Sequence, residues 1–183
     1  MTVRFRGCLT VGLLLALTGC GASAESKGEF SIFLKRQQEG QVAPVLASTT
    51  REAADELIAP DLVLRELVAG PTKAEKSDGF RASLPSSARI VSVRIEGSRV
   101  DVNVSGLPAD DFYAAAATVY SLTELPDIET ISLRLDGKAC CIYDQQSGAI
   151  DPLRRNLFRG WPGEPCELRT YTDAVACRDR QNV

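Results

Sequence analysis

The sequence contains no histidine among its 183 residues. Histidine is the commonest general base in enzymes, a frequent metal ligand and the usual partner of a serine or cysteine nucleophile. Its absence removes the most familiar routes to hydrolysis and to metal binding. We therefore expect no metal and no cofactor in this chain.

The sequence also has no excess of basic over acidic residues. The 21 lysines and arginines are outnumbered by 24 aspartates and glutamates, for a formal net charge of −3, and the two signs are interspersed. A nucleic-acid-binding domain would show a clustered basic face. The composition thus predicts an ordinary soluble surface and no nucleic-acid partner.

No apolar run at the N-terminus is long enough to span a bilayer, which needs about 20 apolar residues. Arg4 and Arg6 precede a short uncharged apolar segment, and small residues follow it before Cys20. This order is typical of an export signal. The ending Leu17-Thr18-Gly19-Cys20 resembles the lipobox of bacterial lipoproteins, which implies cleavage before Cys20 and acylation of that residue.

Two or more acyl chains anchor a protein stably on a membrane, whereas one holds it only marginally. Residues 1–19 are therefore expected to be a signal peptide and Cys20 the site of lipidation, with the mature chain on the extracytoplasmic face of the cell membrane. Residues 20–28 are small or polar, and we interpret them as a flexible tether. About 150 residues remain, enough for one domain with its own core.

The last quarter of the chain has cysteines but no Cys-x-x-Cys pair, which argues against zinc and against a thiol oxidoreductase. An even number of thiols in an exported chain suggests disulfides. A bond between adjacent cysteines would be strained, so we expect each of the first two to pair with one of the last two, in an order that the sequence does not decide. The four candidates are Cys140, Cys141, Cys166 and Cys177.

The middle of the chain predicts strand, helix, hairpin, helix and strand in that order. Pro60 suits a first helical turn, and Gly70-Pro71 ends that helix. Gly97-Ser98 joins two alternating apolar runs in a strong hairpin signal. The predicted elements are a strand at 30–34, a helix at 60–69, strands at 90–95 and 100–104, a helix opened by Asp110-Asp111 and ending before Pro126, and a strand at 131–135.

This order predicts an α+β fold, with two helices on one face of a small mixed sheet. Residues 72–79 are polar and are expected to form a loop. Residues 29–138 would make the domain, and residues 139–183 an irregular extension held by disulfides. Trp161 in that extension could contact a partner, although a lone tryptophan more often plugs a core.

Several short motifs in residues 30–138 resemble the GerMN domain of sporulation and germination proteins. The first helix ends in Leu67-Val68-Ala69-Gly70-Pro71-Thr72, Ser83-Leu84-Pro85 precedes the hairpin, and Val100-Asp101-Val102-Asn103 forms its second strand. The later helix closes with a stretch similar to the family's, and the next strand ends in Asp136-Gly137. The matching residues of that helix end are Val119-Tyr120-Ser121-Leu122-Thr123-Glu124-Leu125-Pro126.

The resemblance implies an extracytoplasmic module similar to the ring-building domains of secretion systems, with no established catalytic residues to transfer. Relatives include sporulation lipoproteins and actinobacterial lipoproteins associated with sensor kinases. This chain has one copy of the motifs rather than a tandem pair, lacks the propeller domain of the kinase-associated group, and adds its own cysteine-bearing tail. Neither specific role is therefore carried over.

Two classes of function remain. The first is a non-enzymatic binding or assembly module of the cell envelope, with an envelope protein as partner or a second copy of the chain. The second is an exported wall hydrolase that uses paired carboxylates as acid and base. Its candidate pairs, Asp110 with Asp111 and Glu124 with Asp127, also suit a helix start and a helix end, so the binding module is the stronger hypothesis.

Overall fold

The computed structural model describes residues 28–37, 43–54, 57–144 and 148–158. The predicted signal peptide, the lipidation site Cys20, Trp161, Cys166 and Cys177 lie outside these residues. So does nearly all of the predicted tether.

The first sheet has three antiparallel strands in the order β2-β1-β3. Strands β1 (Gly28–Arg36) and β2 (Val45–Ala53) pair along their whole length, and the short β3 (Phe80–Arg81) joins the other edge of β1 at Lys35 and Arg36. Most of β1 is buried, which agrees with its run of large apolar residues.

The second sheet has the order β4-β5-β6-β7. Strands β4 (Arg89–Glu96) and β5 (Arg99–Ser105) form the hairpin that Gly97-Ser98 predicts. Strand β6 (Thr130–Leu135) runs parallel to β5, and the short β7 (Lys138–Ala139) turns back beside its end. A separate two-stranded ribbon is formed by β8 (Tyr143–Asp144) and β9 (Gly148–Ala149).

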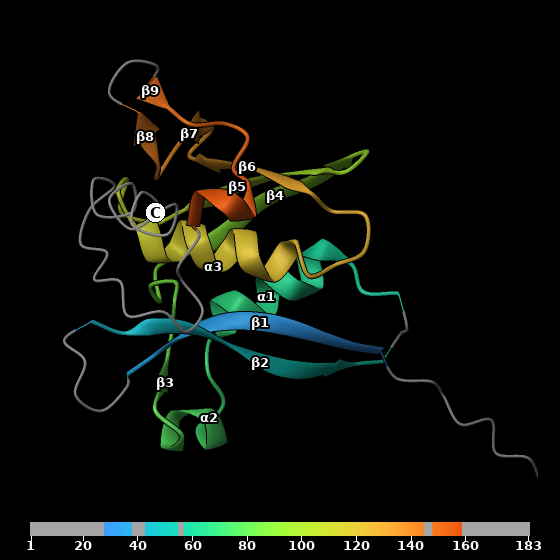
Figure 1. The fold of residues 1–183 in the computed structure, drawn as a ribbon, viewed down its shortest axis with the longest axis vertical. Coiled ribbons are helices and arrows are strands. Elements are labelled where there is room, and N and C mark those ends of the chain that lie inside the picture. Colours follow the sequence, from blue (N-terminus) through green and yellow to red (C-terminus); the bar gives the residue numbers. More distant parts are fainter. Residues whose placement is uncertain (1–27, 38–42, 55–56, 145–147, 159–183) are drawn as a thin grey trace, which may run out of the picture.

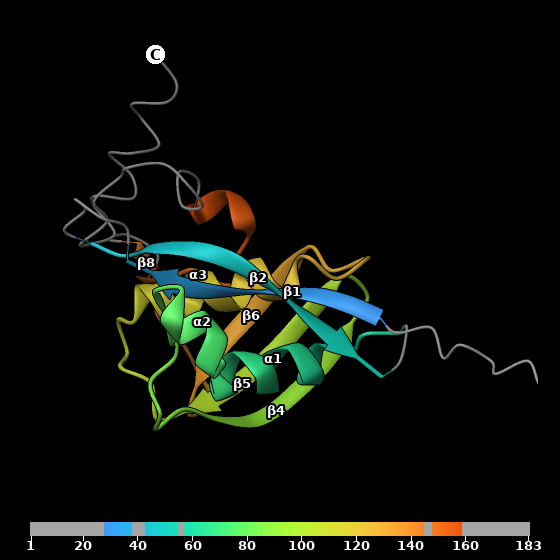
Figure 2. The ribbon, with the colours of Figure 1, turned by 90° about the horizontal axis from the view of Figure 1, so that it is seen from below.

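Helices α1 (Pro60–Ala69) and α3 (Phe112–Leu122) lie between the two sheets and contact strands of both (Figures 1 and 2). Every residue of α3 from Ala114 to Leu122 is buried, and its four consecutive alanines allow neighbouring elements to approach closely. A short helix, α2 (Lys73–Ser77), occupies the segment that we expected to be a loop. No helix in the described part of the chain is both long and apolar enough to cross a bilayer.

The α+β class and the order of the main elements are confirmed, but the strands form two sheets instead of one. The reason lies at the free edge of β1. The Phe33 N–H donates to the Ser121 hydroxyl of α3, and the Ser83 hydroxyl donates to the Phe33 carbonyl. These side chains satisfy the peptide groups that another strand would otherwise pair, so β1 borders a helix there and not β4, β5 or β6.

Several described residues after 138 pack into the same core, although we expected this segment to be an irregular appendage. Leu153 is 1 % exposed and bridges Ile131 of β6, while Phe158 is fully buried at the end of the 3-10 helix η1 (Arg155–Phe158). Residues 150–158 contact β6 and α3, while the domain boundary at residue 138 stays a prediction.

Cys140 and Cys141 form a disulfide with each other, with their Cα atoms 3.7 Å apart. This corrects the expectation that each would pair with Cys166 or Cys177. The backbone conformation brings the two cysteines together. Cys141 has a φ of 82°, a left-handed conformation that turns the chain just after β7. Both cysteines are buried against the core.

Candidate interaction surface

One face of the β4-β5-β6 sheet packs on the helices. On the other face Asp101, Asn103 and Arg134 are at least partly exposed, while Thr130 and Ser132 of β6 are buried. On β5 the inward residues Val100, Val102 and Val104 are at most 2 % exposed. The residues between them, Asp101 and Asn103, point away from the core. We call the solvent side of these three strands the outer face.

The strand register brings polar side chains of the outer face together. Arg94 lies opposite Asp101, and Ser92 lies opposite Asn103 on the β4-β5 hairpin. Asn103 is also in register with Arg134 on β6. Side chains that are opposite in register stand about 5 Å apart, so three strands contribute to one surface.

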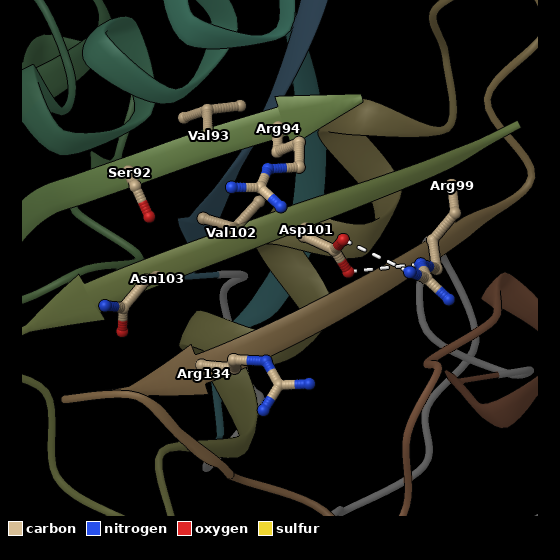
Figure 3. Close-up of a pocket in the computed structure, with 8 residues that line it drawn as sticks. All are labelled: Ser92, Val93, Arg94, Arg99, Asp101, Val102, Asn103 and Arg134. Atoms are coloured by element: carbon tan, nitrogen blue, oxygen red, sulfur yellow. Dashed lines mark hydrogen bonds and ion pairs between the residues drawn. The ribbon is translucent and has the colours of Figure 1, made fainter. Parts of the chain in front are cut away.

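This surface contains a hollow of about 360 Å³, shown in Figure 3. Guanidinium, hydroxyl and amide groups dominate its lining, and Asp101 supplies the one carboxylate among the lining residues. Arg94 and Arg134 extend from the strands on either side of β5. The lining residues are Ser92, Val93, Arg94, Arg99, Asp101, Val102, Asn103 and Arg134.

The three arginines of the hollow differ in how firmly they are paired. Arg99 is held by Asp101, with 3.1 Å between Nε and Oδ1, and by Glu96. The hydrogen bond to Asp101 raises the pKa of Arg99 above its ordinary value. Because Asp101 is engaged in this way, its negative charge is compensated within the hollow.

Within the described residues, the ion-pair and hydrogen-bond partners of Arg94 and Arg134 are all distant. The Arg94 side chain is 77 % exposed and lies 3.9 Å from Glu96. Arg134 contacts the Asp151 carboxylate and the Gly137 carbonyl, each at 3.5 Å. Exposed ion pairs contribute about 0–1 kcal/mol, so these two guanidinium groups can exchange their partners readily.

A second charged cluster joins β2 to α2 and is buried. Arg51 Nη2 donates to Glu75 Oε2 at 2.8 Å, and the Thr49 hydroxyl donates to Glu75 Oε1 at 2.6 Å. Thr72 N–H also donates to Glu75, in a capping box that starts α2. The hydrogen bond from Arg51 is the main cause that lowers the pKa of Glu75 to about 2. This cluster fixes structure, since its groups satisfy one another.

The structure gives two of the candidate catalytic acids other roles. Asp111 accepts the Ala114 N–H at 2.9 Å and is the N-cap of α3. Glu124 is paired with Arg155 of η1. Asp110 and Asp127 are exposed, the latter in a turn with a φ of 65°. In the described part of the chain, no group of three or more acidic, cysteine or histidine side chains could hold a metal ion.

A model of the family described as "Germane: Sporulation and spore germination" matches residues 32–141. The chain belongs to this family. The match covers more than half of the sequence and includes all three strands of the outer face. All the residues that line the hollow therefore belong to the Germane domain, while Asp151 beside Arg134 lies beyond the matched range.

Solved structures support the same assignment of the fold. The tandem GerMN domains of the sporulation protein GerM from Bacillus subtilis are 18 % identical, with a TM-score of 0.56 over 76 % of this chain and 49 % of that one. The chain thus spans about half the length of that tandem structure. No curated protein sequence matches the chain.

Two further structures are similar at lower scores. The first GerMN domain of GerM is 16 % identical, with a TM-score of 0.48 over 71 % of this chain and 98 % of that one. A protein from Clostridium perfringens described as a lipoprotein is 16 % identical, with a TM-score of 0.42 over 70 % of this chain and 88 % of that one.

Sequence reasoning did not single out the outer face of this Germane domain. The signal was present in β5, where Asp101 and Asn103 alternate with valines and must face away from the core. Arg134 is likewise a polar residue between Leu133 and Leu135, although Thr130 and Ser132 on the same side of β6 are buried. What the sequence does not reveal is that β4, β5 and β6 are neighbours in this order, which brings the side chains into one hollow.

Proposed function

We propose that this Germane-domain protein is a non-catalytic binding module, held on the extracytoplasmic face of the cell membrane by acyl chains on Cys20. The observation that carries the binding role is the arginine-lined hollow on the outer face. Among the residues that the structure describes, the other side of the sheet packs on buried helices, and the hollow is lined by exposed or half-exposed side chains such as Arg94 and Arg134.

The contacts of the candidate catalytic acids agree better with a binding role than with hydrolysis. A carboxylate pair that acts as acid and base needs two groups flanking the substrate bond. Asp111 and Glu124 are engaged in a helix cap and an ion pair, so each candidate pair has one member already occupied. The hydrolase hypothesis gains no support from this arrangement.

The anchor is tested in cells with Cys20→Ala. We expect the parent protein in the membrane fraction, with acyl chains detected by intact-mass analysis, and the variant in the soluble extracytoplasmic fraction. Cys8→Ala is the matched control and is expected to behave as the parent. A parent protein without acyl chains would contradict the proposed anchor.

The binding surface is tested by photo-crosslinking in intact cells. A photoreactive residue at Ser92 lies in the hollow, whereas one at Thr50 lies on the exposed side of β2 in the other sheet. We expect a discrete crosslinked product, to protein or to wall polymer, from position 92 and none from position 50. Equal labelling from both positions, or none from either, argues against the outer face.

A further inference from the structure

We infer that the hollow of the outer face binds phosphate groups carried on an extended polyanion, a phosphodiester-type chain of the envelope. This inference rests on the proposed function, because it names the ligand of the same surface.

Charge is the first reason. The protein as a whole carries a net charge of −3, yet the hollow is lined by Arg94, Arg99 and Arg134 against the single carboxylate of Asp101. Glu96 and Asp151 touch these arginines from outside the lining. Since exposed ion pairs are weak, a multiply charged anion can displace these two carboxylates from Arg94 and Arg134.

The donor geometry is the second reason. The neutral side chains of Ser92 and Asn103 line the hollow together with Arg94 and Arg134. The Asn103 Oδ1 already accepts the Gly137 N–H at 2.9 Å, which orients the amide and leaves its NH₂ group as a donor. Apart from Asp101, three strands therefore present arginine and amide donors and the Ser92 hydroxyl, which can also donate. Each phosphate of a phosphodiester chain has two free oxygens, which accept the paired N–H groups of an arginine.

Spacing is the third reason, and it favours a chain of phosphates over a single one. Arg94 is in register with Asp101 and Arg134 with Asn103, so the two arginines are separated by two strand spacings and by two residues along the strand. With about 4.8 Å between strands and about 3.3 Å per residue, their Cα atoms lie about 12 Å apart. Each guanidinium group can therefore engage a different phosphate of one open, extended chain.

The test is a calorimetric titration of the purified soluble protein at low salt. Tripolyphosphate and a glycerol-phosphate polymer are the phosphate-chain probes, while inorganic phosphate and poly-glutamate are the comparison probes. The double variant R94Q/R134Q removes the two loosely paired guanidinium groups. The matched control R65Q/R154Q removes the same charge from two exposed arginines outside the hollow.

We expect both phosphate chains to bind in a salt-dependent manner, more tightly than inorganic phosphate and poly-glutamate. Loss of charge-assisted hydrogen bonds in R94Q/R134Q should weaken binding by about tenfold or more, while R65Q/R154Q stays close to the parent. Each variant's thermal midpoint serves as the check on folding.

Three results would overturn the inference: no binding of phosphate chains, equal weakening in both double variants, or tighter binding of poly-glutamate. Equal affinity for inorganic phosphate would refute the extended chain. None of these results bears on photo-crosslinking at Ser92 in cells. A crosslinked protein partner without phosphate binding would therefore retain the binding module and reject only this ligand.

Discussion

At the scale of single residues, Glu75 is the most constrained charge that the structure describes. Its carboxylate receives hydrogen bonds from Arg51, Thr49 and the Thr72 N–H, and its side chain is only 10 % exposed. A buried charge is tolerated when it is paired and fully hydrogen-bonded. Glu75 therefore ties the middle of β2 to the start of α2.

The variant Glu75→Gln should lower the free energy of unfolding by about 2–4 kcal/mol, since the largely buried Arg51 would keep only the half-exposed Glu66 as a counterion. Chemical denaturation at pH 7 measures this loss. Glu66, the half-exposed second partner of Arg51, supplies the control Glu66→Gln, for which a smaller loss is expected.

The pH dependence has a definite sign. Because folding lowers the pKa of Glu75 to about 2 from 4.5, its stabilisation is complete above pH 4.5 and is lost as the pH falls towards 2. The difference in stability between parent and Glu75→Gln should shrink over this range. A constant difference from pH 7 to pH 2 contradicts the proposed pairing.

Gly106 is a second residue whose backbone conformation and surroundings restrict substitution. Its φ is +73°, and an added Cβ would collide with the Ser87 carbonyl oxygen. We expect Gly106→Ala to lower the unfolding free energy by about 2–4 kcal/mol, from left-handed strain and the clash together. Gly137→Ala is the control, because Gly137 also has a positive φ but has no atom near the added Cβ. Equal losses in the two variants would show that the backbone conformation alone matters.

At the scale of elements, the two acidic residues at the start of α3 can be tested for a structural role. Asp111 caps the helix through the Ala114 N–H, whereas Asp110 is exposed in the preceding turn. Asp111→Ala should lower the unfolding free energy by about 1 kcal/mol and Asp110→Ala by much less. Thermal unfolding of both variants checks this; a larger effect at Asp110 is the contrary outcome.

Strand β4 shows how an open sheet edge is protected. It lies at the end of the second sheet, and Val91 and Ile95 on it are 57 % and 55 % exposed. A bulge between Ile90 and Ser92 interrupts its pairing with β5. Bulges and charged side chains keep exposed edges from pairing with other chains, and β4 carries both.

Deleting Val91 should make the β4-β5 pairing regular and leave a flatter edge. We expect the deletion variant to associate more strongly than the parent as its concentration rises, as measured by analytical ultracentrifugation. Circular dichroism confirms that the variant is folded. A folded variant with the parent's association behaviour would show that the bulge has another purpose.

The elements also show how far sequence reasoning reaches. The β4-β5 hairpin and α1 have local signals, in Gly97-Ser98 and in Pro60 with Gly70, and they were predicted at nearly their observed bounds. Helix α2 was missed because its capping box, Thr72 with Glu75, sits in a polar segment without apolar periodicity. A five-residue helix buries too little to leave a pattern.

Long-range pairings could not be predicted for a different reason. The hydroxyls of Ser83 and Ser121 satisfy the free edge of β1 from 50 and 88 residues away, and this contact separates the two sheets. The outer face depends in the same way on β5 lying between β4 and β6. Such contacts depend on where distant segments pack, and no local spacing encodes them.

At the scale of the whole molecule, the two ends of the described chain meet on α3. Tyr120 stacks against Phe33 of β1, with ring centroids 5.1 Å apart, and its hydroxyl donates to the Phe158 carbonyl at 2.7 Å. Arg155 lies over the Tyr120 ring at 4.7 Å. Burial raises the pKa of Tyr120 to about 12, against the opposing effect of Arg155.

Phe158→Ala should therefore destabilise the entire domain and not only its last turn. We expect a loss of about 3–5 kcal/mol in unfolding free energy, as for other large core truncations. Asn156→Ala, at an exposed position of the same 3-10 helix, is the control and should stay near the parent. A Phe158→Ala variant of parental stability would show that η1 contributes little to the core and would support the predicted boundary at residue 138.

The meeting of Phe33, Tyr120 and Phe158 also has a consequence for the order of events during synthesis. A chain emerges N-terminus first, from a ribosome or from a translocation channel. The Phe33 ring of β1 cannot be fully buried until η1, more than 100 residues later in the chain, has emerged. The core of the described domain can therefore be completed only after η1 has emerged, and until then the incompletely folded chain can still pass through a narrow channel.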